Sequence, residues 1–352
     1  MIMKNIKSIS INKQKQNKMK KLFLFAAIAA IGFASCSEEN FDGNNGNSSK
    51  KIQFKTMVGK NNNLKVTESN TATLKTTGFK VTALNTAAEN FDGSKAYTTE
   101  FNQLAVTHDG SNWIYTGDYY WPETDKLSFF AYAGDDAGVS SFTATTPGFP
   151  YFTYTVNADA SSQKDLLAIN SLNNVDPGAT NTPLALAFKH ILTQVNFSLK
   201  GQVTTLQYDI KKIEIKSAKS VGTYTYNATT GVWSAQSTTA NYTYFSGLTN
   251  IPVNTSSVVS FGNGSVGQAL MLLPQNLNGV TIEVTYDIKN PSGSIVKKDK
   301  VATHTFGASD AWALGTKVRY NFTLPVNSNR IEFNATVDAW DGDTDVNGTL
   351  TK

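Results

Sequence analysis

Cys36 is the residue with the most definite chemistry in this chain, because it is the only cysteine and ends a targeting pattern. Two lysines precede an apolar run at residues 22–31, and the small residues Ala34 and Ser35 lead directly into Cys36. This order is typical of a secretory signal, since the run is too short to span a bilayer. The site also resembles a bacterial lipobox, at which cleavage leaves a cysteine whose thiol carries diacylglycerol. We therefore expect an exported protein anchored by lipid on Cys36, rather than a buried free thiol.

A second candidate for chemistry is the GxGxxG pattern of Gly262, Gly264 and Gly267, which resembles the fingerprint of dinucleotide-binding proteins. That fingerprint needs a following helix to bind pyrophosphate, but the apolar run after it ends at Pro274. The nearby Ser265 lacks the full pattern of a hydrolase nucleophile, because an asparagine precedes it where a glycine is required. We expect a loop between strands here.

Metal binding has two further candidates, the histidines and the acidic C-terminus. His108, His190 and His304 lie far apart and lack the spacing of a zinc site, and we expect a structural role for His108 and His190. Residues 343–348, DTDVNG, match the first half of an EF-hand loop, but the required glutamate would fall after Lys352. We therefore predict no metal, no cofactor and no catalytic residues, and expect that the protein is not an enzyme.

The apparent basic charge of the chain comes from the predicted signal peptide. Residues 1–35 contain seven lysines and no acidic residue, so their removal changes 31 basic and 27 acidic residues to 24 and 27, a net charge of about −3. This removes the main argument for a nucleic-acid partner. Met19 is the expected translation start, because the signal is complete from that residue.

Residues 36–49 are polar and rich in asparagine, a composition that favours a flexible tether over a packed core. Glu38 and Glu39 stand close behind Cys36, and acidic residues at this place resemble the export signal of Bacteroidetes surface lipoproteins. We expect the lipid on Cys36 to lie in the outer membrane, with the protein facing outward.

After residue 50 the elements that must position any site are almost all strands. Ile52, Phe54, Thr56 and Val58 alternate with residues of the opposite face, the period of a half-buried strand. Further strands are predicted at 77–84, 126–133, 184–199, 269–273, 280–288, 317–324 and 331–339, with hairpin turns at Asp109-Gly110 and at residues 229–231. Helix is expected to be a minor component.

Two features indicate sandwich packing. The strand at 126–133 is apolar on both faces, which is typical of a strand inside a sandwich. The aromatic residues Trp121 and Phe130 could stack on sugars if they were exposed, but their positions in predicted strands favour packing. A break at residues 176–183, with two prolines and a glycine, interrupts the pattern.

The break divides the folded part of the chain. We predict a signal peptide at 1–35, a lipidated tether at 36–49, an N-terminal β-sandwich domain at 50–180 and a C-terminal β-sandwich domain at 181–352. Just over 300 residues with many short strands is an ordinary size for two such domains in series.

Several segments also occur in a characteristic order along the chain. They are Trp113, DYYWPETDKLSFFAYAG at 118–134, QKDLLAI at 163–169, LALAFKHILTQVNFSL at 184–199, WALGTKVRYNFTL at 312–324 and IEFNATVDAW at 331–340. This order is similar to that of the fimbrillin (Mfa-like) family of Bacteroidetes, lipoprotein precursors of type V pili. The resemblance implies an all-β fold of two transthyretin-like β-sandwich domains, and assembly rather than catalysis.

In polymerising members of that family a protease removes the N-terminal strand, and a strand of the next subunit fills the groove. This is β-augmentation, in which backbone hydrogen bonds and alternate side chains hold the joint. The resemblance implies that the displaced strand holds Ile52, Phe54, Thr56 and Val58. A candidate donor is the C-terminal tail, in which Val346, Gly348 and Leu350 share one face.

The chain departs from the family at the maturation site. The best-known cleavage follows an arginine after the first strand, but no arginine occurs between Cys36 and Lys317. Lys60 and Lys65 are then the candidate cleavage sites. Without cleavage the protein would keep its lipid and could be an anchor or a non-polymeric relative.

Three functions follow from these alternatives. The favoured one is a fimbrial subunit that joins other fimbrial subunits head to tail and supports cell adhesion. The second is a non-polymerising surface lipoprotein that binds glycans or other ligands on host or bacterial surfaces. The third, a hydrolase with an unrecognised site, lacks any set of acid, base and nucleophile in the sequence.

Overall fold

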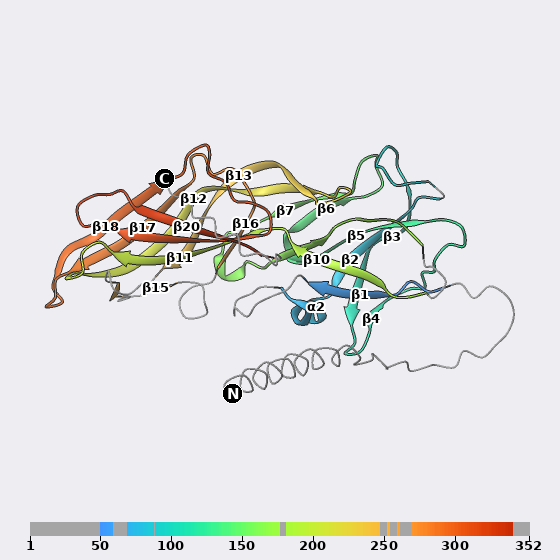
Figure 1. Cartoon of the computed structure of the whole chain (residues 1–352), viewed down its shortest axis with the longest axis horizontal. Helices are drawn as coiled ribbons and strands as arrows, with labels where there is room; N and C mark the ends of the chain where they lie inside the picture. The colour runs from blue at the N-terminus through green and yellow to red at the C-terminus, as the bar shows by residue number, and fades with distance from the viewer. Residues whose placement is uncertain are drawn as a thin grey trace, which may run out of the picture. The chain divides into compact units, whose positions relative to one another are not determined.

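The computed structural model describes residues 50–58, 69–87, 89–176, 181–246, 252–253, 259–260 and 269–340. Strands form nearly all of the regular structure in these ranges, which confirms the predicted all-β class (Figure 1). The described residues contain one α-helix, α2 (Thr71–Thr77), and two single 3₁₀ turns, η1 (Asp136–Gly138) and η2 (Ala160–Ser162). None of the described helices is long and apolar enough to cross a membrane.

The first sheet contains eight strands and carries the predicted N-terminal strand at one edge. Its order is β1 (Phe54–Val58), β10 (Leu184–His190), β8 (Leu166–Ile169), β5 (Leu127–Gly134), β2 (Phe79–Asn85), β3 (Thr98–His108) and β4 (Trp113–Tyr115), with β9 (Leu172–Val175) also paired to β5. β1 pairs with β10 in parallel, whereas the other pairs are antiparallel.

Two further sheets complete the described fold. The seven-stranded sheet has the order β18 (Ile295–Thr305), β17 (Thr281–Lys289), β12 (Gln207–Thr225), β7 (Tyr151–Thr155) and β6 (Val139–Thr143), and β13 (Val232–Ser246) and β14 (Pro252–Val253) pair with β12. The five-stranded sheet has the order β15 (Val259–Ser260), β11 (Thr193–Gly201), β19 (Thr316–Leu324) and β20 (Glu332–Ala339), and β16 (Leu270–Leu272) pairs with β11.

Strand β5 contributes to two hydrophobic cores, which explains why it is apolar on both faces. Phe129 packs in the core that also contains Phe54 and Phe79, whereas Phe130 belongs to the larger core with Phe152. Both Phe129 and Phe130 are fully buried. The prediction that this strand lies inside a sandwich is confirmed.

Both predicted hairpin turns are confirmed. Between β3 and β4 the Asp109 carboxylate accepts hydrogen bonds from the backbone N–H groups of Ser111 and Asn112, at 2.8 and 2.7 Å. The second turn joins β12 to β13, which pair from Thr225 and Val232 onward.

The strand predicted at 184–199 is wrong as a single element. The chain breaks at Ile191 and Leu192, so that β10 pairs with β1 and β8, whereas β11 enters the five-stranded sheet. Both residues at the break are buried. The connection between the two sheets is therefore itself buried and apolar, so the sequence pattern shows no interruption where the chain leaves one sheet and enters the other.

The strand predicted to begin at Thr77 also differs, because residues 71–77 form helix α2. Its first turn is capped by Asn70, whose side chain accepts hydrogen bonds from the N–H groups of Ala72 and Thr73. Gly78 ends the helix with φ +74°, a conformation that favours glycine, and β2 begins at Phe79.

Strand pairing crosses the domain boundary predicted at residue 180. β10 follows the boundary but pairs within the first sheet, and β7 precedes it but pairs with β12. The division into two domains in series therefore stays a prediction.

Candidate strand-exchange site

The candidate site is the position of residues 50–58 along the first sheet. Residues 36–49, 59–68, 261–268 and 341–352 lie outside the described residues. These ranges contain the predicted lipidation site Cys36, the cleavage candidates Lys60 and Lys65, the donor candidates Val346, Gly348 and Leu350, the GxGxxG glycines and the DTDVNG segment. The structure thus describes the displaced-strand candidates and their surroundings.

The first contact of the segment is the parallel pairing of β1 with β10. Phe54 stands opposite Leu184 and Val58 opposite Phe188. The N–H of Leu184 donates to the carbonyl of Gln53 at 2.7 Å. Figure 1 shows β1, in blue, alongside β10. Among the described strands, β1 pairs with β10 alone and is therefore an edge strand.

The second contact joins residues 50–52 to the segment that follows β4. The N–H of Ile52 donates to the carbonyl of Tyr119 at 3.0 Å, and the N–H of Trp121 donates to the carbonyl of Lys50 at 2.8 Å. The Tyr115 hydroxyl donates to the carbonyl of Ile52. β10 and β4 lie toward opposite ends of the strand order, so residues 50–58 connect the two margins of the same sheet.

The side chains of the segment alternate between the core and the surface, as predicted. Ile52, Phe54 and Val58 are buried, and Thr56 is half-buried on the same face. The ring of Phe54 makes edge contacts with Phe79, Tyr115 and Phe129, at centroid distances of 5.8, 5.9 and 6.5 Å. The segment is thus a true part of the hydrophobic core and also the edge of its sheet.

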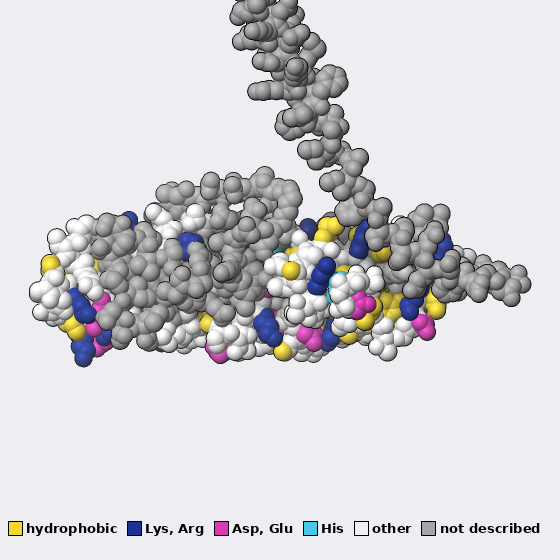
Figure 2. All heavy atoms as spheres, turned by 90° about the horizontal axis from the view of Figure 1, so that it is seen from below, with side chains coloured by type: hydrophobic (Ala, Val, Ile, Leu, Met, Phe, Trp, Pro, Cys, Tyr) yellow, Lys and Arg dark blue, Asp and Glu magenta, His cyan; other side chains and the backbone are white. Residues whose placement is uncertain are grey.

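Charged and exposed groups lie on the outer side of the segment. Lys51 Nζ is 3.0 Å from the Asp118 carboxylate and 5.5 Å from the centroid of the Tyr115 ring. Met57 is 54% exposed. Figure 2 views the side on which β1 is drawn in Figure 1, and hydrophobic side chains are interspersed there with basic and acidic ones on the described surface.

Burial alters the acidity of Tyr115, whose hydroxyl contacts the segment. Desolvation, with a further contribution from the charge of Asp118, raises the pKa of Tyr115 to about 12. The phenol therefore stays protonated at physiological pH and keeps its hydrogen bond to the Ile52 carbonyl.

Two hydrogen bonds hold the chain where it re-enters the described structure after β1. The Thr71 hydroxyl accepts a hydrogen bond from the N–H of Val58 at 3.3 Å, and the Asp165 carboxylate accepts one from the N–H of Ser69 at 3.1 Å. Ser69 therefore has its own attachment to the body of the protein. Cleavage within residues 59–68 would separate residues 50–58 from a start of α2 that stays attached.

His190 lies in a strand, as predicted, and is buried beside Asp165. Its Nδ1 is 2.7 Å from the Asp165 carboxylate, and its ring stacks on Trp340 at a centroid distance of 4.1 Å. The two members of the pair are 25 residues apart in the sequence, so no local spacing could indicate their contact. His108 lies at the end of β3, where its Nδ1 accepts a hydrogen bond from the N–H of Gly110.

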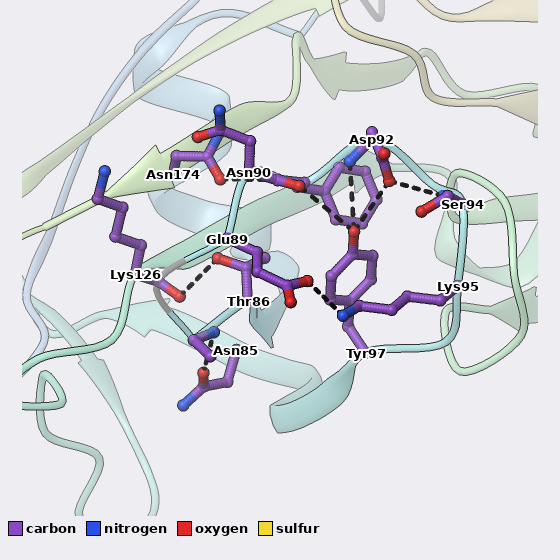
Figure 3. A network of polar contacts seen from close by, with 12 residues as sticks. Asn85, Thr86, Glu89, Asn90, Asp92, Ser94, Lys95, Tyr97, Lys126 and Asn174 are labelled. Atoms are coloured by element: carbon purple, nitrogen blue, oxygen red, sulfur yellow. Dashed lines mark hydrogen bonds and ion pairs between the residues drawn. The ribbon is translucent and has the colours of Figure 1, made fainter.

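The loop between β2 and β3 carries a dense polar network, which Figure 3 shows from close by. The Asp92 carboxylate accepts hydrogen bonds from the Ser94 N–H and the Tyr97 hydroxyl, at 2.8 and 3.0 Å, and Lys95 pairs with Glu89. These groups bond to one another, which is the pattern of a structural loop. In the described part of the chain no group of three or more His, Cys, Asp or Glu side chains could hold a metal ion.

The two aromatic residues considered for sugar stacking are both buried. Phe130 is fully buried, and Trp121 makes an edge contact with Phe129 at 5.5 Å. The prediction that these rings pack in the protein is confirmed. The expected strand position is wrong for Trp121, which lies beyond β4 in a segment held by Lys50.

The fold and the site define an all-β protein whose N-terminal segment forms one edge of a sheet and packs its buried face into the core of that sheet. The fimbrillin-like family model matches residues 65–340, and the chain belongs to that family. The resemblance stated from the sequence is thereby confirmed.

Individual relatives agree with the family match. The chain is 24% identical to the fimbrium subunit Fim1C of Phocaeicola vulgatus over 92% of its own length and 98% of that protein. The crystal structure of a fimbrial protein from Bacteroides vulgatus superposes with a TM-score of 0.64 at 19% identity, covering 82% of this chain and 99% of that one. The second likeness shows the same fold.

Proposed function

We propose that this protein is a non-enzymatic fimbrial subunit that polymerises by exchanging residues 50–58 for a strand of a neighbouring subunit. Membership of the fimbrillin-like family supports the fimbrial role. The observation that carries the exchange step is the place of residues 50–58, which fill a core position while occupying a sheet edge. Edge strands can be replaced by another strand without breaking the rest of the sheet.

In the proposed maturation, the subunit is first exported as a lipoprotein. Lipid on Cys36 would hold it at the outer membrane, facing outward, until a protease cuts after Lys60 or Lys65. The neighbouring subunit would then supply the replacement strand; from the sequence pattern alone, the C-terminal tail with Val346, Gly348 and Leu350 is a candidate. Head-to-tail contacts of this kind form filaments because they do not close into rings. The filament would serve cell adhesion.

A disulfide lock tests the exchange step. Met57 and Ala187 are register partners on β1 and β10, and both side chains are exposed. The double variant Met57→Cys/Ala187→Cys should hold β1 in place without disturbing the core. We expect it to abolish the ladder of oligomers on unheated SDS gels of surface fractions, and reduction should restore the ladder.

The matched control is Thr107→Cys/Ile114→Cys, an exposed register pair on β3 and β4 of the same sheet. This lock leaves residues 50–58 free and should not affect the ladder. If polymers form equally well with β1 locked, exchange of this strand is not the assembly step. The N-terminus of protein recovered from cells gives a second reading: an acylated Cys36 indicates a retained anchor, and a terminus near residues 59–66 indicates removal of β1.

A further inference from the structure

We propose that the site left by residues 50–58 is selective for a strand with a cationic side chain at the position of Lys51 and an apolar one at the position of Thr56. The occupant would be a strand from a different protein chain and not the acidic tail of a second copy. This inference rests on the proposed function, because it concerns which strand can enter the site.

The first observation is the environment of the Lys51 side chain. Its ammonium group lies between the Asp118 carboxylate and the Tyr115 ring, and its backbone pairs with Tyr120 in an antiparallel bridge. A carboxylate and an aromatic face both attract a cation. The segment at 116–125 contains three acidic residues and no basic one, so Asp118 has no basic neighbour within that segment.

The second observation is the charge of the segment that leaves. Residues 50–58 contain three lysines and no acidic residue. Their departure removes three positive charges and leaves the Asp118 carboxylate without Lys51. An entering strand with a cation at the Lys51 position restores the pair, whereas an acidic side chain there faces a like charge. Like charges at a contact disfavour the wrong partner.

The third observation is Thr56. Its hydroxyl oxygen is buried and has no hydrogen-bond partner in the described structure. A buried polar atom without a partner opposes binding, and a valine of similar shape removes that cost. The chain's own strand is therefore an imperfect occupant, and a strand that is apolar at this position binds more tightly.

The C-terminal tail fails the first requirement when it enters in the direction of residues 50–58 with Val346 at the position of Ile52, Phe54 or Thr56. The residue at the Lys51 position is then Asp345, Asp343 or Asp341 respectively. Each alignment places an aspartate against Asp118. For entry in this direction, the sign of the charge therefore favours a donor strand other than the tail.

The test uses the full mature chain with a protease site placed in residues 59–68. Cutting that site leaves residues 50–58 bound without a covalent link. The probes are four synthetic peptides: the native KKIQFKTMV, its Lys51→Glu form, its Thr56→Val form, and the tail peptide DGDTDVNGTLTK. The measurement is how strongly each peptide displaces the resident strand, at low salt and at 0.5 M salt.

We expect the Thr56→Val peptide to bind about tenfold more tightly than the native one. The Lys51→Glu peptide should bind about fivefold more weakly at low salt, and this difference should shrink in 0.5 M salt because the contact is exposed. The tail peptide should fail to displace the strand. In the Asp118→Lys variant the Lys51→Glu peptide should become the better ligand of the two.

Asp109→Lys is the matched control, because Asp109 is an acidic residue in the β3–β4 turn whose hydrogen bonds stay within that turn. It should leave the ranking of the peptides unchanged. Equal binding of the native and Lys51→Glu peptides, or displacement by the tail peptide, would overturn the inference while the exchange mechanism stands. If the native peptide itself cannot exchange, the proposed function fails instead.

Discussion

Phe54→Ala provides the sharpest test of how residues 50–58 are held. The Phe54 ring is 5% exposed and touches three other rings in the core. Replacing a buried phenylalanine by alanine typically costs about 3–5 kcal/mol, through lost transfer free energy and the cavity that remains. At the lower end, the affinity of a severed strand for its site falls about a hundredfold.

The assay follows release of the strand from a chain cut within residues 59–68. In protein made without its signal peptide, Cys36 is the only thiol and lies on the fragment that leaves. A fluorescent maleimide on Cys36 therefore reports release as a fall in anisotropy. Because loss of core contacts weakens the bound state, we expect the Phe54→Ala fragment to dissociate at a much lower urea concentration than the native fragment.

Met57→Ala is the internal control for that measurement. Met57 lies in the same strand but is 54% exposed, and surface substitutions usually change stability by less than about 0.5 kcal/mol. If the Phe54→Ala fragment is released no more readily than the Met57→Ala fragment, the segment is not held by its buried face, and the reasoning is refuted.

Three further outcomes follow from single sites. Thr56→Val should stabilise the bound strand by about 1.4 kcal/mol and so raise the urea midpoint of strand release, because it removes a buried hydroxyl without a hydrogen-bond partner in the described structure; an unchanged midpoint would show that the hydroxyl is satisfied. Burial raises the folded pKa of Tyr115 from the ordinary tyrosine value of 10.0 to about 12, so the stabilising effect of the protonated phenol is complete below pH 10 and lost as the pH rises toward 12. Strand release should therefore accelerate over this range in the native chain and less in Tyr115→Phe, and identical pH profiles would contradict the assignment. Gly134→Ala should destabilise the whole fold by more than about 2 kcal/mol in chemical denaturation, since φ is +100° and the new Cβ would lie 2.0 Å from the Asp165 carbonyl oxygen; a native denaturation curve would count against this backbone contact.

The parts of the fold that local pattern determines could be predicted from the sequence. The alternation from Ile52 to Val58 predicted both the strand and its buried face. The two-sided apolar run at 127–132 predicted a central strand, and Asp109-Gly110 predicted a turn. Each of these signals lies within a few consecutive residues, where side-chain direction follows directly from the period of the backbone.

The parts that depend on distant partners could not be predicted in the same way. β1 pairs with Leu184–Phe188, about 130 residues later, and nothing in either segment specifies the other. The 119–121 segment binds residues 50–52 outside any strand, so it shows no strand period. β18 was missed because its exposed residues are rich in lysine and other polar types, which hide the period of a strand whose ladder pairing is with β17.

The side-by-side pairing of β1 with β10 has a mechanical consequence. A strand in this position that is pulled along its own axis slides against its neighbour, so the force is shared by all the register pairs from Phe54–Leu184 to Val58–Phe188. Those contacts must yield together, whereas a strand peeled from one end loses them in turn. A filament joined at such sites would resist a pull along its length, such as fluid drag. It would resist far less well a bending force that lifts one end of a strand.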